Sequence, residues 1–165
     1  MNAVIEKLAS SDIDQLKFLW RQLYLHHDRL APHLAVLGPI RPPEESWRLR
    51  REQYLGWQQE SRTAVLVARD QDRLLGYAVV RVAHAPGSWQ WGDDVGVLET
   101  LVIDDEARGT GVGHALLEGA RRHLAGFRIK VMKISVVAGN QGALRFYRRE
   151  GASDFVETLI MPLSD

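Results

Sequence analysis

Apolar side chains recur at two different spacings along this chain, so we expect both helices and strands. Over residues 13–24 they recur every three or four positions, after a Ser-Ser-Asp cap at residues 10–12, which predicts a helix that ends before Pro32. Four prolines in residues 31–43 predict a loop. The segment Pro43–Ser61 opens with a proline and two acids, which predicts a second helix.

The middle of the chain is rich in β-branched residues. Residues 63–69 and 74–83 show this pattern on either side of a polar turn at residues 70–73, which predicts a hairpin. Residues 84–94 are turn-like and include two tryptophans, and residues 95–103 predict the next strand.

The last third of the chain begins with a glycine-rich stretch at residues 108–113. A helical pattern follows it to about Leu124, and residues 129–137 are apolar on both faces, as in a buried strand. We expect a short helix over residues 140–151 and a closing strand over residues 155–161. Residues 4–8 predict a first strand ahead of these elements. The predicted order is β, α, α, β, β, β, loop, α, β, α, β, which indicates an α/β (α+β) fold with a mixed sheet and helices on both faces.

The length and composition fit a single domain over residues 1–165. Hydrophobic residues make up 45% and charged residues 25% of the chain. There is no cysteine, which excludes disulfides, thiolate zinc sites and a cysteine nucleophile. We see no signal peptide and no apolar run of membrane-spanning length, so we expect a cytoplasmic protein without a membrane partner.

The formal net charge is zero, which argues against bulk nucleic-acid binding. The charges are nevertheless unevenly placed: residues 93–106 hold six acids and no base, whereas residues 107–149 hold nine Lys or Arg and one acid. Two interpretations stand. The charges are ordinary surface decoration, or a basic half faces a polyanion beside an acidic half that faces a cation.

The stretch RGTGVGHALL, which starts at Arg108, is typical of a phosphate-binding loop between a strand and a helix. It is not a Walker loop, because His114 and Ala115 follow the last glycine where Lys and Ser or Thr are needed. A dinucleotide fingerprint is also a poor match, because the next predicted strand carries no acid. A tight turn without a ligand remains the alternative.

The spacing Arg108-x-x-Gly111-x-Gly113 resembles the acyl-coenzyme A signature of the GNAT superfamily of N-acetyltransferases. Free amides at a helix start carry partial positive charge, and glycine lets a pyrophosphate approach the backbone. The resemblance extends to Asn140 and to Tyr147 seven residues later, and it covers about residues 95 to 155.

The resemblance implies a mostly antiparallel sheet with a splayed central strand pair, acetyl-coenzyme A as co-substrate and no metal. Its pantetheine is expected to pair with the strand end Leu101-Val102-Ile103. The positions that match the family's coenzyme A contacts are Leu101, Val102, Ile103, Arg108, Gly109, Thr110, Gly111, Val112, Gly113, His114, Asn140, Ala143 and Tyr147. Arg108 has an alternative partner in Asp104 or Asp105, and Asn140 is a good helix cap with or without a ligand.

Direct transfer from a thioester to an amine needs a base for the amine and benefits from an acid for the leaving thiolate. We assign Tyr147 as the acid, because its hydroxyl is neutral at pH 7 and its spacing from Asn140 matches the family; the alternative is a core aromatic on an amphipathic helix. We assign Glu99 as the base, because a carboxylate within an apolar strand is either functional or paired with a cation. Asp93 and Asp94 are the reserve candidates for the base, and His114 is a weaker one.

The implied function is an acyltransferase that acetylates a small cationic amine. The acidic residues between positions 93 and 106 would attract this cation. Two alternatives remain open: a ribosomal-protein-type N-terminal acetyltransferase, and a non-catalytic acyl-coenzyme A sensor. Trp89 and Trp91 either form the wall of an amine pocket or only pack their loop. The histidines between residues 26 and 33 match no metal-ligand spacing. The family resemblance allows a homodimer, although no sequence feature indicates one.

Overall fold

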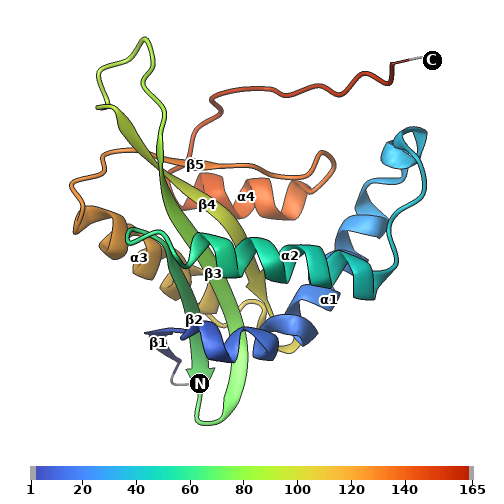
Figure 1. Cartoon of the computed structure of the whole chain (residues 1–165), viewed down its shortest axis with the longest axis horizontal. Helices are drawn as coiled ribbons and strands as arrows, with labels where there is room; N and C mark the ends of the chain where they lie inside the picture. Colours follow the sequence, from blue (N-terminus) through green and yellow to red (C-terminus); the bar gives the residue numbers. More distant parts are fainter. Residues whose placement is uncertain (1–2, 164–165) are drawn as a thin grey trace.

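The computed structural model describes residues 3–163, which form a five-stranded sheet with helices on both faces (Figure 1). The strands are β1 (Val4–Lys7), β2 (Ala64–Asp70), β3 (Arg73–His84), β4 (Asp94–Ile103) and β5 (Met132–Ile134). The α-helices are α1 (Lys17–Leu30), α2 (Pro43–Trp57), α3 (Val112–Ala125) and α4 (Gln141–Arg149). Short 3₁₀ helices span Ser10–Leu16, Pro32–Leu37 and Asp105–Ala107.

The sheet has the strand order β1-β2-β3-β4-β5, and every neighbouring pair is antiparallel except β4 and β5. The predicted mixed, mostly antiparallel sheet is therefore confirmed. The predicted hairpin is also confirmed, and its turn is tight, with Gln71 at a positive φ of 55°. Among residues 3–163, no helix is both long enough and apolar enough to cross a membrane.

Each face of the sheet is covered by its own helices. On one face, α1 and α2 pack on β-strand side chains that include Val67 and Tyr77. On the other face, α3 inserts Leu116 and Leu117 against alternate residues of the same strands. This alternation is the period of two expected for strands that are buried on both sides.

The predicted helices exist, but their ends differ from the prediction. The cap expected at residues 10–12 is absent: these residues belong to a 3₁₀ helix whose N-cap is Ala9, and no side chain caps it. The α-helix begins only at Lys17 and ends before Pro32, as predicted. The second helix begins at Pro43 as predicted but stops at Trp57 rather than Ser61.

The two last predicted strands are wrong in extent or in existence. Only Met132–Ile134 of residues 129–137 is in a strand, and this strand is half-buried because the sheet ends there. Residues 155–161 form no strand. Their β-branched and apolar composition favours extended backbone, but a strand needs a partner edge, and in the structure this segment pairs with none.

Candidate functional site

The parallel contact between β4 and β5 is short. It joins Gly96–Leu98 to Met132–Ile134 and then ends, so the two strands diverge toward their carboxyl ends. Residues 100–103 of β4 stay paired with β3 on one edge. Their opposite edge, which includes Leu101 and Ile103, has no strand partner within the described part of the chain. The backbone there is free to pair with an extended ligand.

A β-bulge lies where β4 and β5 separate. Val79 of β3 lies opposite Thr100, and the next residue, Val80, lies opposite Leu98, which leaves Glu99 as the extra residue. Thr100 is buried and shares a 2.7 Å hydrogen bond with the hydroxyl of Tyr54 on α2. Bulges re-aim side chains and are frequent near active sites.

The carboxylate of Glu99 is paired with a cation, which is one of the two outcomes expected from the sequence. Arg81 Nη1 donates to Glu99 Oε1 at 3.0 Å, and Arg81 Nη2 donates to Glu60 Oε1 at 2.9 Å. The guanidinium also stacks over the Trp57 ring, 4.6 Å from its centroid. Glu99 Oε2 has no hydrogen-bond donor among residues 3–163, so this oxygen remains free to accept a proton.

The glycine stretch forms the turn that starts α3. Gly111 is the N-cap and has a φ of +89°, in the left-handed region that favours glycine. A Cβ built on Gly111 would meet nothing within 4 Å, so the space beside it is open. Among the described residues, the amides of Gly111, Val112, Gly113 and His114 donate to no acceptor. Four free amides at the positive end of a helix are the arrangement that suits an anion.

A buried carboxylate, Asp104, anchors the start of the loop that leads from β4 to α3. Asp104 accepts hydrogen bonds from Arg73 Nη2 at 2.7 Å, from Gln22 Nε2 at 3.2 Å and from the Glu106 amide at 3.4 Å. Burial by itself would raise the pKa of Asp104, but these donors outweigh burial and hold the pKa below its ordinary value. The loop therefore rests on an ionised aspartate in the α1 side of the core.

Arg108 at the start of the loop pairs with Asp105 at 2.7 Å, and both side chains are exposed. One of the two partners expected from the sequence is therefore confirmed. An exposed ion pair of this kind contributes little to stability and breaks readily, so Arg108 stays available to a charged ligand.

The first turn of α3 lies against α4. A Cβ built on Gly113 would be 3.4 Å from the Phe146 ring and 3.7 Å from Ile103 Cγ1. The next residue of α3, His114, has its Nδ1 2.9 Å from Glu150 Oε2. The two halves of the motif recognised in the sequence are thus brought together in space, at the carboxyl end of β4.

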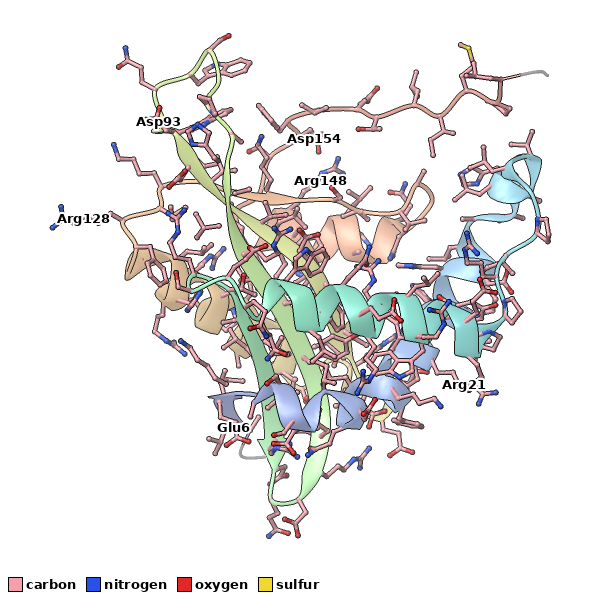
Figure 2. The ribbon with its side chains drawn as sticks, viewed as in Figure 1. Glu6, Arg21, Asp93, Arg128, Arg148 and Asp154 are labelled. Carbon is pink, nitrogen blue, oxygen red and sulfur yellow. The ribbon has the colours of Figure 1, made fainter. Side chains whose placement is uncertain are left out.

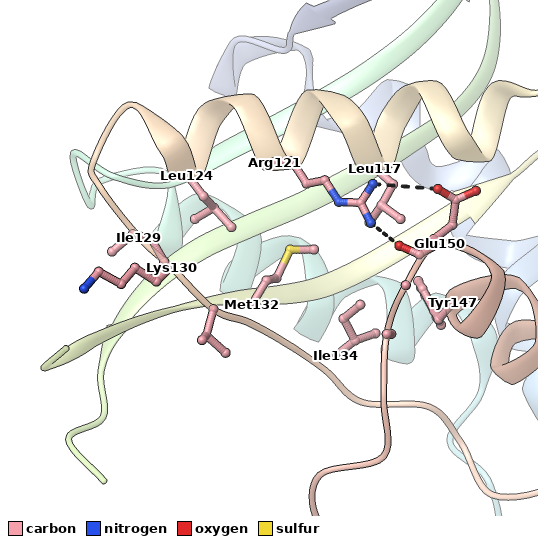
Figure 3. Close-up of a pocket in the computed structure, with 12 residues that line it drawn as sticks. Leu117, Arg121, Leu124, Ile129, Lys130, Met132, Ile134, Tyr147 and Glu150 are labelled. Carbon is pink, nitrogen blue, oxygen red and sulfur yellow. Dashed lines mark hydrogen bonds and ion pairs between the residues drawn. The ribbon is translucent and has the colours of Figure 1, made fainter. Parts of the chain in front are cut away.

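Asn140 is the N-cap of helix α4, and its Oδ1 accepts from the Ala143 amide at 3.1 Å. Tyr147 is half-buried and borders a hollow of about 380 Å³ between α3, β5 and α4 (Figure 3). Burial raises the pKa of Tyr147 to about 12, so the hydroxyl keeps its proton throughout the neutral range.

The two assigned catalytic residues approach from different sides of the sheet. Glu99 lies with Arg81 and Trp57 on the side of α1 and α2, whereas Tyr147 packs against the core on the side of α3. A substrate in the gap between β4 and β5 would lie between these two sides. The structure brings no direct contact between Glu99 and Tyr147.

The acidic run does not form one anionic face. Asp94 pairs with Arg62 at 2.6 Å and with His84 at 3.2 Å, and its pKa is lowered mainly by the hydrogen bond from Arg62. Asp104, Asp105, Glu106 and Glu99 also have arginine partners. Asp93 is exposed and has no ion pair among residues 3–163. The surface-decoration interpretation therefore accounts for most of these charges.

The two tryptophans pack against each other and against the C-terminal segment. The Trp89 and Trp91 rings stack with centroids 5.6 Å apart, and Phe155 lies edge-on to both. Lys133 Nζ lies 5.5 Å from the Trp91 and Phe155 ring centroids. Of the two roles expected from the sequence, loop packing is observed, and the cluster also holds a cation.

The sequence did not reveal several residues that support the site. Arg81, Arg73 and Gln22 come from distant parts of the chain, and no spacing motif links them to Glu99 or Asp104. The one sequence feature that indicates such a partner is Glu99 itself: a carboxylate in an apolar strand suggests a nearby cation, but the sequence does not show which residue provides it. No group of three His, Asp or Glu side chains within residues 3–163 could hold a metal ion.

Comparison with known proteins identifies relatives. The Acetyltransferase (GNAT) family matches residues 20–152. The chain is similar to a mycothiol acetyltransferase from Geodermatophilus obscurus, with 35% identity over 85 residues, which are 52% of this chain and 27% of that protein. The chain thus spans about a quarter of the curated relative that it matches.

Solved structures share the fold. The tetramutant of the BH1408 protein from Bacillus halodurans has a TM-score of 0.78 and 20% identity, covering 97% of this chain and 99% of that one. A GCN5-related N-acetyltransferase from Ralstonia eutropha has a TM-score of 0.74 and 19% identity, covering 98% and 99%. The aminoglycoside N-acetyltransferase AAC(6')-Iy, in complex with a coenzyme A bisubstrate analogue, has a TM-score of 0.74 and 15% identity, with 100% of both chains covered.

The Asp104 anchor generates a pH-dependent prediction. We expect Asp104→Asn to lower the unfolding free energy at pH 7 by roughly 1–3 kcal/mol, because the donors around this buried position lose a charged acceptor. Since the folded-state pKa is depressed, the carboxylate stabilises the fold fully above about pH 4, and this contribution is lost as the pH falls through the folded value. Urea unfolding should therefore show a difference that shrinks as the pH falls below about 4.

The matched control is Asp28→Asn, at an exposed aspartate without an ion pair in the described part of the chain. Its unfolding free energy should stay within about 0.5 kcal/mol of the parent at every pH. A difference for Asp104→Asn that is constant over the whole pH range would rule out the ionised carboxylate as the anchor.

Proposed function

Because the chain belongs to the GNAT acetyltransferase family, we propose that it transfers an acetyl group from acetyl-coenzyme A directly to a primary amine of a small cationic molecule. One observation carries the proposal: four free amides at the start of α3 lie beside the open edge of β4. An acyl carrier fits both features if it has an anionic group for the free amides and, next to it, an extended arm with amide groups for the open edge of β4.

The residues present fit coenzyme A. The amides of Gly111 to His114 would hold the diphosphate, with the open space at Gly111 admitting its oxygens and Arg108 adding charge. The free edge of Leu101–Ile103 would pair with the amides of the pantetheine arm. Asn140 and Ala143, at the start of α4, would contact the same carrier. When bound, acetyl-coenzyme A supplies the activated acetyl thioester.

The protein's own groups supply the proton transfers. Tyr147 keeps its proton at neutral pH and can protonate the leaving thiolate. Glu99 has one oxygen free of hydrogen-bond donors from residues 3–163 and can take a proton from the amine, directly or through water. The amine must lose this proton before it attacks, because alkylamines are mostly protonated at pH 7.

The choice of a cationic acceptor is supported by the β3–β4 loop rather than by the acidic run. Trp89 is exposed and stacks on Trp91, and the exposed carboxylate of Asp93 lies on the same loop. Aromatic faces next to a carboxylate attract ammonium groups. The aminoglycoside acceptor of AAC(6')-Iy, whose fold is similar, is a cation of this class.

The test is release of coenzyme A thiol in the presence of a panel of amines: aminoglycosides, polyamines, amino-acid derivatives and peptides with free N-termini. Turnover with a small polycation supports the proposal. Turnover only with peptides would favour N-terminal acetylation, and tight acetyl-coenzyme A binding without turnover on any amine would favour a sensor.

Gly113 provides a prediction about the carrier site. We expect Gly113→Leu to weaken coenzyme A binding at least tenfold, because the new side chain would enter the space beside Ile103 and Phe146. Leucine is a good helix former, so the helix itself should tolerate the change. Isothermal titration calorimetry measures the Kd, and Gly142→Ala, in the exposed first turn of α4, is the control. Unchanged affinity would place the carrier elsewhere.

For Tyr147→Phe we expect kcat to fall by at least about tenfold, toward the range usual for loss of a general acid. The Kd for coenzyme A should change little, because the ring remains. Steady-state kinetics with the best amine checks this, and Tyr24→Phe, which removes a hydroxyl bonded to the Arg41 carbonyl, is the control. An unchanged kcat would remove Tyr147 from the chemistry.

The variant Glu99→Gln tests whether Glu99 acts as a general base or only forms an ion pair with Arg81. We expect kcat/KM to drop by about 10²-fold or more at pH 7, with the loss reduced at higher pH, where more of the amine is already neutral. Glu60→Gln is the matched control, because Glu60 pairs with the same Arg81 at a similar distance. If both variants lose activity equally, the role of Glu99 is only to hold Arg81.

A further inference from the structure

Helix α2 places an arginine on the face that it packs against the sheet. The side chains on this face recur at helical spacing: Trp47, Arg50, Tyr54 and Trp57. Trp47 and Tyr54 are buried, and Arg50, about one turn from each of them, is half-buried. Figure 2 shows side chains of α1 and α2 meeting in the layer that these helices form over the sheet. A charged side chain in such a layer needs a physical explanation.

The Arg50 guanidinium lies on aromatic rings and has no carboxylate partner. Its Cζ is 5.0 Å from the centroid of the Trp20 ring on α1 and 5.8 Å from the centroid of the Tyr54 ring. Within residues 3–163 no hydrogen bond or ion pair satisfies this guanidinium, whereas the other arginines of α2, Arg48 and Arg51, pair with carboxylates at 3.0 and 2.7 Å. The rings fix the position of the cation and leave its N–H groups available to an anion.

The surroundings of Arg50 offer further donors but no anion. The indole N–H of Trp20 is buried and has no acceptor in the described part of the chain. Burial lowers the pKa of His27, and the charges of His26 and Arg50 lower it further, so the His27 ring is neutral at pH 7. Arg50 therefore acts as a single positive charge. A carboxylate matches it both in charge and in bidentate geometry.

Arg50 and the candidate base lie on the same side of the sheet, around Tyr54. The Tyr54 hydroxyl shares a 2.7 Å hydrogen bond with Thr100, the residue that follows Glu99 in β4. Burial raises the pKa of Tyr54, the charge of Arg50 lowers it and the charge of Glu99 raises it, so both charges act on this one hydroxyl. A small acceptor whose amine reaches Glu99 thus has an unpaired cation on the same side of the sheet.

We propose that Arg50 determines acceptor specificity by binding a carboxylate of the acceptor, which is then a diamino acid rather than a simple polyamine. This inference rests on the proposed function and names the class of amine. A diamino acid with both amines protonated keeps a net positive charge, as the proposed acceptor does. Because the rings of Trp20 and Tyr54 hold the guanidinium in place beforehand, little further ordering is needed to form the contact.

The test compares pairs of acceptors that differ at one group. L-Lysine and L-ornithine are each offered beside the corresponding carboxamide, and release of coenzyme A thiol is measured. We expect kcat/KM for at least one of the carboxylates to exceed that for its amide by about tenfold or more, because the amide cannot form the charged pair with Arg50. Turnover of the amide that equals or exceeds that of the carboxylate in both pairs would overturn this inference and leave the proposed function standing.

Variants of Arg50 locate the source of the preference. Arg50→Gln should reduce the ratio within a pair to about twofold or less, and Arg50→Lys, which keeps the charge but not the planar fork, should give an intermediate ratio. The ratio is the informative quantity, because a merely structural defect lowers both members of a pair alike. Arg48→Gln, at an exposed arginine of the same helix, is the control and should keep the parental ratio. A parental ratio in Arg50→Gln would mean that another group binds the carboxylate.

Calorimetry tests the same contact without turnover. The two pairs are titrated into the parent chain and into Arg50→Gln with coenzyme A present. If no amine is acetylated, tighter binding of the carboxylates that is lost in Arg50→Gln would sustain the role of Arg50 while contradicting the proposed function. If neither carboxylate is acetylated or bound more tightly than its amide, the inference is wrong. Thermal unfolding of the Arg50 variants verifies their fold, and the parental preference is a test that needs no variant.

Discussion

The structure depends on a parallel contact that stops after three residue pairs. Gly96–Leu98 and Met132–Ile134 hold β4 and β5 together, and beyond them the strands separate. A longer ladder would satisfy more backbone groups, but it would also close the gap that leaves the end of β4 accessible. The bulge at Glu99 lies where the two strands separate. There the carboxylate of Glu99 points toward Arg81, and the hydroxyl of Thr100 points into the core, where it shares a hydrogen bond with the Tyr54 hydroxyl.

The supports of the site come from both layers of helices. From the α1 side, Gln22 and Arg73 hold Asp104 under the loop that leads to α3. From the other side, Phe146 of α4 and Glu150, which follows that helix, meet Gly113 and His114 in the first turn of α3. The free amides are thus positioned by groups that lie on opposite faces of the sheet.

The divergence of β4 and β5 leaves the carboxyl end of β4 with an open edge that suits a small extended ligand. The outer edge of β5 is open for another reason, because β5 is the last strand of the sheet. Tyr147 borders the hollow between α3, β5 and α4. Partial burial of this position raises the pKa of the Tyr147 hydroxyl to about 12.

The sequence by itself determined the elements whose pattern is local. The hairpin of β2 and β3, the glycine turn with Gly111 at a positive φ, the Asn140 cap and the family follow from periodicity, backbone freedom and motif spacing. Only the tertiary structure decided the partners of Glu99 and Asp104, the pairing of most acids with arginines, and the failure of residues 155–161 to form a strand. The physical reason is that ion pairs and strand pairing join residues far apart along the chain, so no local pattern encodes which groups will meet.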